Sequence, residues 1–238
     1  MELWIPVTLL AALAQTVRFG LQRQLKTTRL SSTGATLARY LYSVPLAGFG
    51  AVIYAAVTGQ VWPALTLGFW GYLTLGGGTQ ILATVCMMGL FARRNFSVGI
   101  AFTKTTVLMA VPVGWVLLGD TASLWGILAI FIGFVGVVIL SDIPSDSGAG
   151  FARRITNPAT GLGLAAGFLF ALAGVGYRGA VLEMGAIDPV FRALFSLACA
   201  TVLQTAVLTV WMRAREPGEV TRVIKAWRIA GLVGIASM

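Results

Sequence analysis

Long apolar segments separated by short polar ones run along the whole chain. Between Val98 and Ser141, two apolar runs flank a short polar hinge at 119–123. Each run has about 20 residues, and a helix that rises 1.5 Å per residue then spans about 30 Å, the thickness of the hydrocarbon core of a membrane. The hinge permits only a tight hairpin. Thr121 and Ser123 are suited to cap the second helix, because their hydroxyls accept hydrogen bonds from free backbone N–H groups.

The same pattern predicts seven membrane helices and the start of an eighth. The predicted membrane helices are Leu3–Gln22, Gly34–Val57, Leu67–Phe91, the two within 98–141, Thr160–Leu182 and Pro189–Met212. A short interfacial helix is expected within 213–228, and a further apolar run begins at Ile229. The first helix is interpreted as retained rather than as a signal peptide, because Glu2 stands where a signal peptide carries basic residues.

Small residues mark helix faces that allow close packing. Ala47, Ala51 and Ala55 are four residues apart and form one stripe on the second predicted helix. Glycines 76–78 lie inside the third predicted helix, where glycine lowers helix stability. They indicate either a close helix contact or a local break.

Composition supports a membrane protein. Hydrophobic residues make up 58% of the chain and charged residues 11%, whereas about 25% of the residues of a soluble domain are charged. The net charge of +9 is not interpreted as a nucleic-acid surface, because the basic residues cluster in short loops. The absence of histidine excludes imidazole catalysis and histidine-ligated metal sites, and no cofactor is expected. Cys86 and Cys199 lie in apolar runs and are expected to be free thiols.

The loop charges predict the orientation of the chain. Lysine and arginine concentrate in the loops after the first, third, fifth and seventh predicted helices. Because basic loops stay on the cytoplasmic side, these loops are expected to be cytoplasmic and the N-terminus extracytoplasmic.

A weak internal repeat predicts the architecture. The segment Arg39–Ser43 resembles Arg192–Ser196 at an offset of 153 residues, and five helices per repeat place the second repeat in the opposite orientation. The expected fold is an all-α membrane protein, a polytopic bundle of two inverted five-helix repeats of which the second is incomplete. The chain therefore resembles about four fifths of a ten-helix transporter. The predicted parts are a first repeat at 1–142, a linker at 143–158 and a partial second repeat at 159–238.

The hinge region also resembles a known family. The residues that carry the resemblance are Pro112, Leu117, Leu118, Gly119, Asp120, Gly126, Gly133 and Gly136, followed by a valine-rich end. Together they are similar to the fourth and fifth helices of the EamA-type drug/metabolite transporters, although that family usually has glutamate where this chain has Asp120. The resemblance implies export or exchange of small metabolites across a bacterial inner membrane by alternating access, without ATP. It also implies cytoplasmic termini for many members, which is the reverse of the orientation that the loop charges predict.

Five polar residues in apolar segments are candidates for contact with a substrate: Lys104, Gln15, Arg18, Gln80 and Tyr177. Lys104 lies about two turns into the fourth predicted helix and is expected to face a cavity between the repeats. Gln15 and Arg18 are three residues apart and are expected to share a helix face. Gln80 is expected to bind either a neighbouring helix or a substrate. A cationic cavity of this kind favours an anionic or zwitterionic solute.

Other polar residues have a structural interpretation. Asp120 and Pro112 are expected to act as hinge residues, with Asp120 as a helix cap rather than a proton carrier. Arg18 is about one turn from the end of its predicted helix, so its charge is able to reach the basic loop that follows. The same interpretation applies to Arg39 and Arg192, about one turn inside their helices, and Arg178 is expected at the membrane interface.

Several functions remain open at this stage. A secondary transporter of a small-molecule substrate in the inner (plasma) membrane agrees best with the repeat and the resemblance. The alternatives are a lipid-linked sugar flippase, whose polyprenyl phosphate would suit a cationic cavity, an integral-membrane enzyme, and a scaffold. An enzyme lacks histidine and has few acidic residues with which to build an active site. The expected partners are the solute and the lipid bilayer, and a homodimer is left open.

Overall fold

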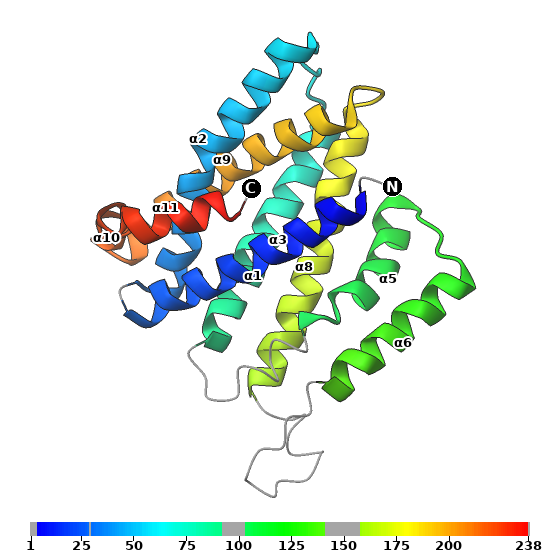
Figure 1. The fold of residues 1–238 in the computed structure, drawn as a ribbon, viewed down its shortest axis with the longest axis horizontal. Helices are drawn as coiled ribbons and strands as arrows, with labels where there is room; N and C mark the ends of the chain where they lie inside the picture. The colour runs from blue at the N-terminus through cyan, green and yellow to red at the C-terminus, as the bar shows by residue number, and fades with distance from the viewer. Residues whose placement is uncertain (1–3, 29, 92–102, 141–157, 238) are drawn as a thin grey trace, which may run out of the picture. The chain divides into compact units, whose positions relative to one another are not determined.

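The structure, a computed structural model, describes residues 4–28, 30–91, 103–140 and 158–237. These residues form helices and connecting turns, with no strand among them (Figure 1). The helices are α1 Trp4–Thr28, α2 Ser32–Thr58, α3 Leu67–Phe91, α5 Thr106–Leu118, α6 Leu124–Leu140, α8 Pro158–Glu183, α9 Pro189–Arg215, α10 Glu219–Lys225 and α11 Trp227–Ile235.

The apolar pattern located these helices well. Helix α3 has the same bounds as predicted, and α2, α8 and α9 differ from the prediction by a few residues at their ends. Helix α5 begins at Thr106, later than the apolar run that starts at Val98, and residues 92–102 lie outside the described part. Helix α1 continues to Thr28, six residues beyond the predicted end. That extension changes the depth of every polar residue in its second half.

Four of the described helices, α2, α3, α8 and α9, are long and apolar enough to cross a membrane. Helices α5 and α6 are apolar but shorter. The chain is therefore an all-α protein of the membrane class. The predicted linker at 143–158 lies outside the described residues except for Pro158, the first residue of α8.

The helices group into two compact units. One unit combines Met1–Ala64 with Ala186–Met238, and the other is Leu65–Gly185. Each unit therefore takes helices from both of the predicted repeats. Compact units do not show whether two segments are related by symmetry or by descent. The division into repeats at 1–142 and 159–238 therefore stays a prediction.

In the first unit, α2 and α9 pack antiparallel over their whole length (Figure 1). At one end of the pair the Tyr54 hydroxyl donates to Asp188, 3.0 Å away, and at the other end the Ser31 hydroxyl donates to Glu216, 2.7 Å away. The predicted stripe of small residues on α2, Ala47, Ala51 and Ala55, is buried as expected.

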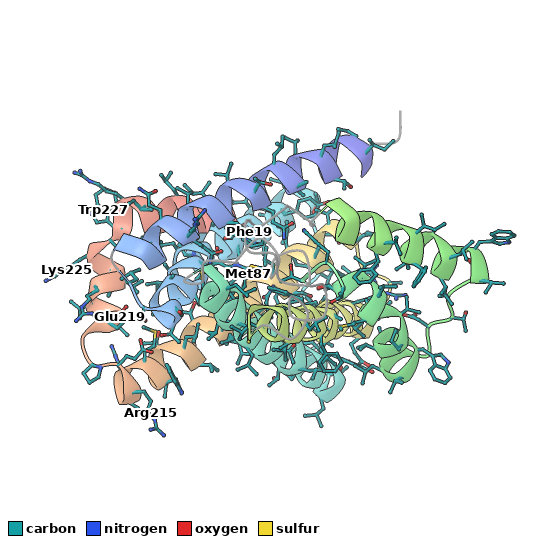
Figure 2. The ribbon with its side chains drawn as sticks, turned by 90° about the horizontal axis from the view of Figure 1, so that it is seen from below. Phe19, Met87, Arg215, Glu219, Lys225 and Trp227 are labelled. Carbon is teal, nitrogen blue, oxygen red and sulfur yellow. The ribbon has the colours of Figure 1, made fainter. Side chains whose placement is uncertain are left out.

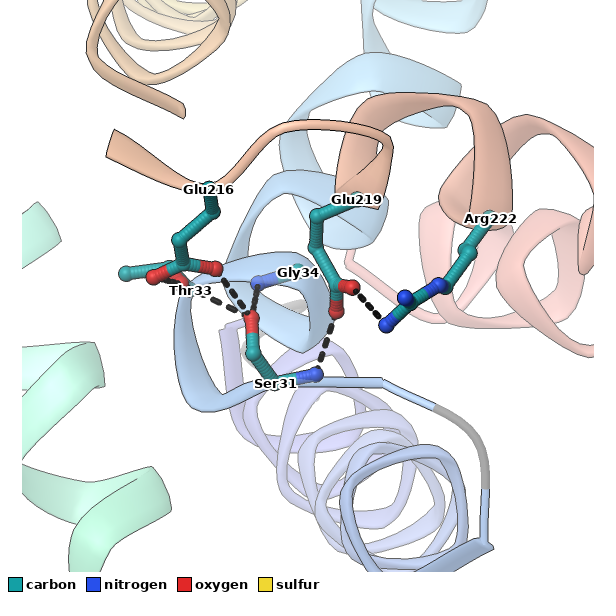
Figure 3. Close-up of polar contacts among 6 residues, drawn as sticks. All are labelled: Ser31, Thr33, Gly34, Glu216, Glu219 and Arg222. Atoms are coloured by element: carbon teal, nitrogen blue, oxygen red, sulfur yellow. Dashed lines mark hydrogen bonds and ion pairs between the residues drawn. The ribbon is translucent and has the colours of Figure 1, made fainter. Parts of the chain in front are cut away.

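Two carboxylates secure the start of α2 (Figure 3). Glu219 is 3% exposed and accepts a hydrogen bond from the Ser31 backbone N–H. Glu216 accepts hydrogen bonds from the hydroxyls of Ser31 and Thr33. The helix start carries free N–H groups and a partial positive charge, so negative side chains stabilise it. Arg222 forms an ion pair with Glu219 at 2.9 Å and balances its charge.

The end of α9 and the helices α10 and α11 present a basic, aromatic surface. Arg215, Lys225 and Trp227 are exposed and point away from the helices (Figure 2). The predicted interfacial helix within 213–228 is thus helical in its middle, as α10. Its mixture of cations with tryptophan is typical of a segment at the surface of a membrane.

In the second unit, α3 and α8 pack antiparallel and in backbone contact. A Cβ atom added to Gly176 of α8 would lie 2.8 Å from the backbone nitrogen of Gly76 in α3. Only glycine permits such an approach. The glycines at 76–78 therefore mark a close helix contact rather than a break, since α3 is continuous through them.

Helix α6 follows α5 through a tight turn and remains mostly exposed. The Ser123 hydroxyl accepts from the Gly126 backbone N–H at 3.1 Å, which confirms Ser123 as the cap of this helix. Apolar residues lie all around α6, as expected of a helix that contacts hydrocarbon.

Candidate functional site

Two of the predicted site residues of the second unit, Gln80 and Tyr177, are paired with each other. The Tyr177 hydroxyl of α8 donates to the Gln80 side-chain oxygen of α3 at 2.7 Å. This bond lies one turn from the contact between Gly76 and Gly176, so it joins two helices that already touch. A hydrogen bond to a neighbouring helix is one of the two roles that were expected of Gln80.

Asp120 has a second role besides the turn between α5 and α6. Its carboxylate forms an ion pair with Arg178 of α8, and its backbone N–H donates to the Gly114 carbonyl at 3.3 Å. Asp120 does not cap α6, because Ser123 does so. A partly exposed ion pair of this kind contributes little to stability, but it fixes the end of α5 against α8. Pro112 lies inside α5, where the missing N–H weakens the helix, and its predicted hinge role stays open.

Lys104 lies in a turn before α5 and its side chain is exposed. Thr103 before it is helical and α5 begins at Thr106, whereas residues 92–102 lie outside the described part. The expected depth of Lys104 in a helix and its predicted contact with a substrate therefore stay predictions.

Arg18 is the deeply buried cation of the first unit. It is 9% exposed, and it lies about 15 Å before the end of α1 rather than about one turn before it, because α1 extends to Thr28. An arginine stem carries its charge over about one helical turn, so it does not reach the end of the helix. The predicted reach of Arg18 to the basic residues that begin at Arg23 stays a prediction, because the end of α1 does not mark a membrane surface.

Gln15 does not share the surroundings of Arg18. Its side chain is exposed, whereas that of Arg18 is buried. Three positions along a helix differ by about 60° in direction, which is enough to separate a packed from an open face. The buried neighbour of Arg18 on α1 is Gln22, four residues later and 0% exposed. The apolar pattern did not single out Gln22, because this residue is the last of the predicted helix.

Helix α2 places a second cation, Arg39, near Arg18. Arg39 lies about 10 Å after the start of α2, and its positive charge acts on Arg18. The Arg39 guanidinium lies over the ring of the buried Tyr40, 5.2 Å from its centre. The Arg18 guanidinium lies over the Phe19 ring at 4.8 Å. Aromatic faces stabilise a cation without neutralising it.

Two polar atoms in this cluster lack a hydrogen-bond partner. They are the Nε of Arg18, a donor, and the Oε1 of Gln22, an acceptor. The Gln22 amide nitrogen faces the Ala35 carbonyl of α2 at 3.5 Å, which directs the amide oxygen away from that carbonyl. Within the described residues no ion pair joins Arg18 or Arg39 to a carboxylate. We call Arg18, Gln22 and Arg39 the arginine cluster.

Arg192, the counterpart of Arg39 in the internal repeat, has different surroundings. It lies in the first turn of α9, and its charge acts on Asp188, the residue that caps this helix. The backbone N–H of Phe191 holds the pKa of Asp188 below its ordinary value, and the Tyr54 hydroxyl and Arg192 act in the same direction. The charge of Arg192 thus acts on a carboxylate at the start of its own helix.

No group of three or more potential metal ligands among histidine, cysteine, aspartate and glutamate occurs in the described residues. Cys86 and Cys199 are free thiols, as predicted. No family model, curated protein or solved structure matches the chain. The case for a function therefore rests on the residues and their geometry.

Proposed function

We propose that the protein is a secondary transporter, an exporter or exchanger, that moves small anionic or zwitterionic metabolites across a membrane by alternating access. The observation that carries this proposal is the position of Arg18. A guanidinium that is 9% exposed and forms no ion pair with a carboxylate of the described residues is costly to bury. Such residues usually face a solute path, so the charge of Arg18 supports an anionic substrate.

The pairing of helices is consistent with the proposed inverted repeat. In that scheme α8, α9 and α11 correspond to α1, α2 and α3. The pair α2 with α9 then corresponds to itself, and the pair α3 with α8 corresponds to α11 with α1. All three pairs are in contact within their own units. Internal repeats of inverted topology are common in secondary transporters, and such a repeat agrees with the resemblance to EamA-type drug/metabolite transporters.

Of the predicted cations, Arg18 has the strongest support as a substrate contact. Lys104 is exposed in a turn, and Arg178 forms an ion pair with Asp120. Gln80 and Tyr177 hydrogen-bond to each other across α3 and α8 and hold these helices together. We therefore place the substrate of the transporter near α1 and α2.

Flux measurements test the proposal. The full chain is reconstituted in liposomes, and uptake of labelled carboxylates, amino acids and phosphate esters is followed into vesicles that are preloaded with the same unlabelled compound. We expect protein-dependent exchange of at least one anionic or zwitterionic compound and none of a neutral sugar. Liposomes without protein are the control. The absence of exchange for every compound would contradict the proposal and favour a scaffold.

A further inference from the structure

The arginine cluster has the composition of a binding site that is short of one partner. Arg18 is 9% exposed and Gln22 is 0% exposed, so water reaches them poorly. A buried charge without a counter-ion is strongly unfavourable, and so is a buried donor or acceptor without a hydrogen bond. Arg39 adds a second positive charge and no negative one. The unpaired buried charge and the unpartnered hydrogen-bonding atoms both become favourable when an anion binds at the cluster.

The two unpartnered atoms require different groups on that anion. The Arg18 Nε–H needs an acceptor, which an oxyanion provides. The Gln22 Oε1 needs a donor, which a bare carboxylate lacks. Residues four apart on a helix lie on one face, about 6 Å from each other. A ligand that serves both atoms therefore carries a hydrogen-bond donor as well as an oxyanion.

We propose that Arg18, Gln22 and Arg39 bind a small oxyanion, a carboxylate or phosphate, that bears a hydroxyl or ammonium group beside the charged group. This inference rests on the proposed transport function and names the class of its substrate: hydroxy acids, amino acids and phosphate esters of polyols. Arg18 and Arg39 hold the oxyanion. Gln22 accepts from the neighbouring donor and so distinguishes these compounds from simple acids.

The same chemistry has two sources. A free metabolite offers an oxyanion with a nearby hydroxyl, and so does the phosphoglycerol headgroup of phosphatidylglycerol. Arg39 is half-buried, whereas Arg18 and Gln22 are buried. The experiment has to separate the two.

The test compares two probes that differ by one hydroxyl group, lactate and propionate. Their affinities are measured by titration calorimetry for the full chain in nanodiscs of phosphatidylcholine. We expect lactate to bind at least about tenfold more tightly, because a site that hydrogen-bonds a hydroxyl rejects the analogue without it. Glycerol 3-phosphate is expected to compete with lactate.

Three variants assign the effect to residues. Gln22→Met removes the acceptor and is expected to lower the lactate-to-propionate ratio to about one. Arg18→Met is expected to weaken both probes by more than tenfold. Arg215→Met removes an exposed cation at the end of α9 and is expected to change neither affinity. Where Arg18→Met does not yield folded protein, Arg18→Lys keeps the charge without the Nε–H and is expected to weaken lactate.

Phosphatidylglycerol in the nanodiscs identifies the source. Displacement of lactate by this lipid in the unaltered chain supports the site with a headgroup as its occupant, and undisturbed lactate binding supports it with a free solute. Equal affinity for lactate and propionate, absence of binding of all three probes, or unchanged lactate affinity in Arg18→Met would overturn the inference. Binding without flux would refute the transport function alone. Flux that is insensitive to Arg18 and Gln22 would refute the site alone.

Discussion

At the scale of the residue, the same charge has different consequences in different surroundings. Lys104 is exposed in a turn before α5. Arg18 is 9% exposed, so solvent replaces a missing partner poorly. Asp188 is half-buried and has three favourable partners, a backbone N–H, a hydroxyl and Arg192. Partners and burial together, rather than residue type, therefore separate a structural charge from a candidate for binding.

Asp188 provides a prediction about pH. Its pKa is lowered in the folded chain from the ordinary value of 3.8, first by the hydrogen bond from the Phe191 N–H. Because folding lowers the pKa of Asp188, the charged carboxylate stabilises the fold at pH values above its ordinary pKa of 3.8. This stabilisation is lost as the pH falls through the lowered pKa of the folded chain. Asp188→Asn keeps a capping oxygen but has no charge to titrate.

We therefore expect Asp188→Asn to lower the thermal midpoint at pH 7. The difference from the unaltered chain is expected to shrink below pH 3.8 as the carboxylate of the unaltered chain becomes protonated. Melting curves of both proteins between pH 7 and pH 3 measure this. A difference that stays constant over the whole range would show that the charge of Asp188 does not stabilise α9.

At the scale of the element, the helices pair in two different ways. Helices α3 and α8 meet through glycines and come into backbone contact at Gly76 and Gly176. Helices α2 and α9 have hydrogen-bonded ends, at Tyr54 with Asp188 and at Ser31 with Glu216. The first pair depends on the absence of side chains in its middle, and the second on polar side chains near its ends.

A single methyl group tests the contact between α3 and α8. In Gly176→Ala the new Cβ would lie 2.8 Å from the Gly76 nitrogen, 2.9 Å from its Cα and 3.0 Å from the Tyr72 carbonyl oxygen. These are backbone atoms, which cannot rotate away. We expect destabilisation of about 1–3 kcal/mol, the range of overpacked cores, measured as a lower thermal midpoint in detergent.

Gly174→Ala is the matched control. It lies on the same helix, and a Cβ there meets nothing within 4 Å. Because alanine is a better helix former than glycine, this variant is expected to be neutral or to gain up to about 1 kcal/mol. Equal effects of both substitutions would mean that helix propensity, and not the close approach, decides the stability of this pair.

At the scale of the whole molecule, the open question is how the chain lies in the membrane. The loop charges predict an extracytoplasmic N-terminus, and the resemblance to EamA-type drug/metabolite transporters implies the reverse. Helix α9 ends with exposed Arg213 and Arg215 at a basic surface (Figure 2), which the charge rule assigns to the cytoplasm. The turn between α5 and α6 is then on the opposite side.

Cysteine labelling decides the orientation. Cys86 and Cys199 are replaced by alanine, and Ser123→Cys is introduced in the exposed turn before α6. We expect a membrane-impermeant maleimide to label this cysteine in intact cells, and to label Arg213→Cys, at the end of α9, only after the membrane is opened. Labelling of Ser123→Cys from the cytoplasmic side alone would reverse the orientation and support the topology that the resemblance implies.

The sequence by itself determined the class of the protein and the places of its helices. Segments of about 20 apolar residues satisfy their backbone hydrogen bonds internally only as helices, so periodicity and length were sufficient for α3, and nearly so for α2 and α9. The stripe of Ala47, Ala51 and Ala55 likewise predicted a packed face, because positions four apart lie together on any helix. The position of a helix and the face on which a residue lies are local properties, so the sequence pattern alone predicts them.

Only the tertiary structure decided which polar residues have partners. Gln80 and Tyr177 are 97 positions apart, and their hydrogen bond depends on how α3 meets α8. The arginine cluster depends on the end of α1, where polar residues continue a helix that the apolar pattern ended at Gln22. Arg18 is buried beside Arg39 because α1 packs on α2. The distance of a charge from the end of its helix cannot be known before that end is known. Contacts between distant segments are set by the packing of the whole unit, and for that reason no stretch of sequence shows them.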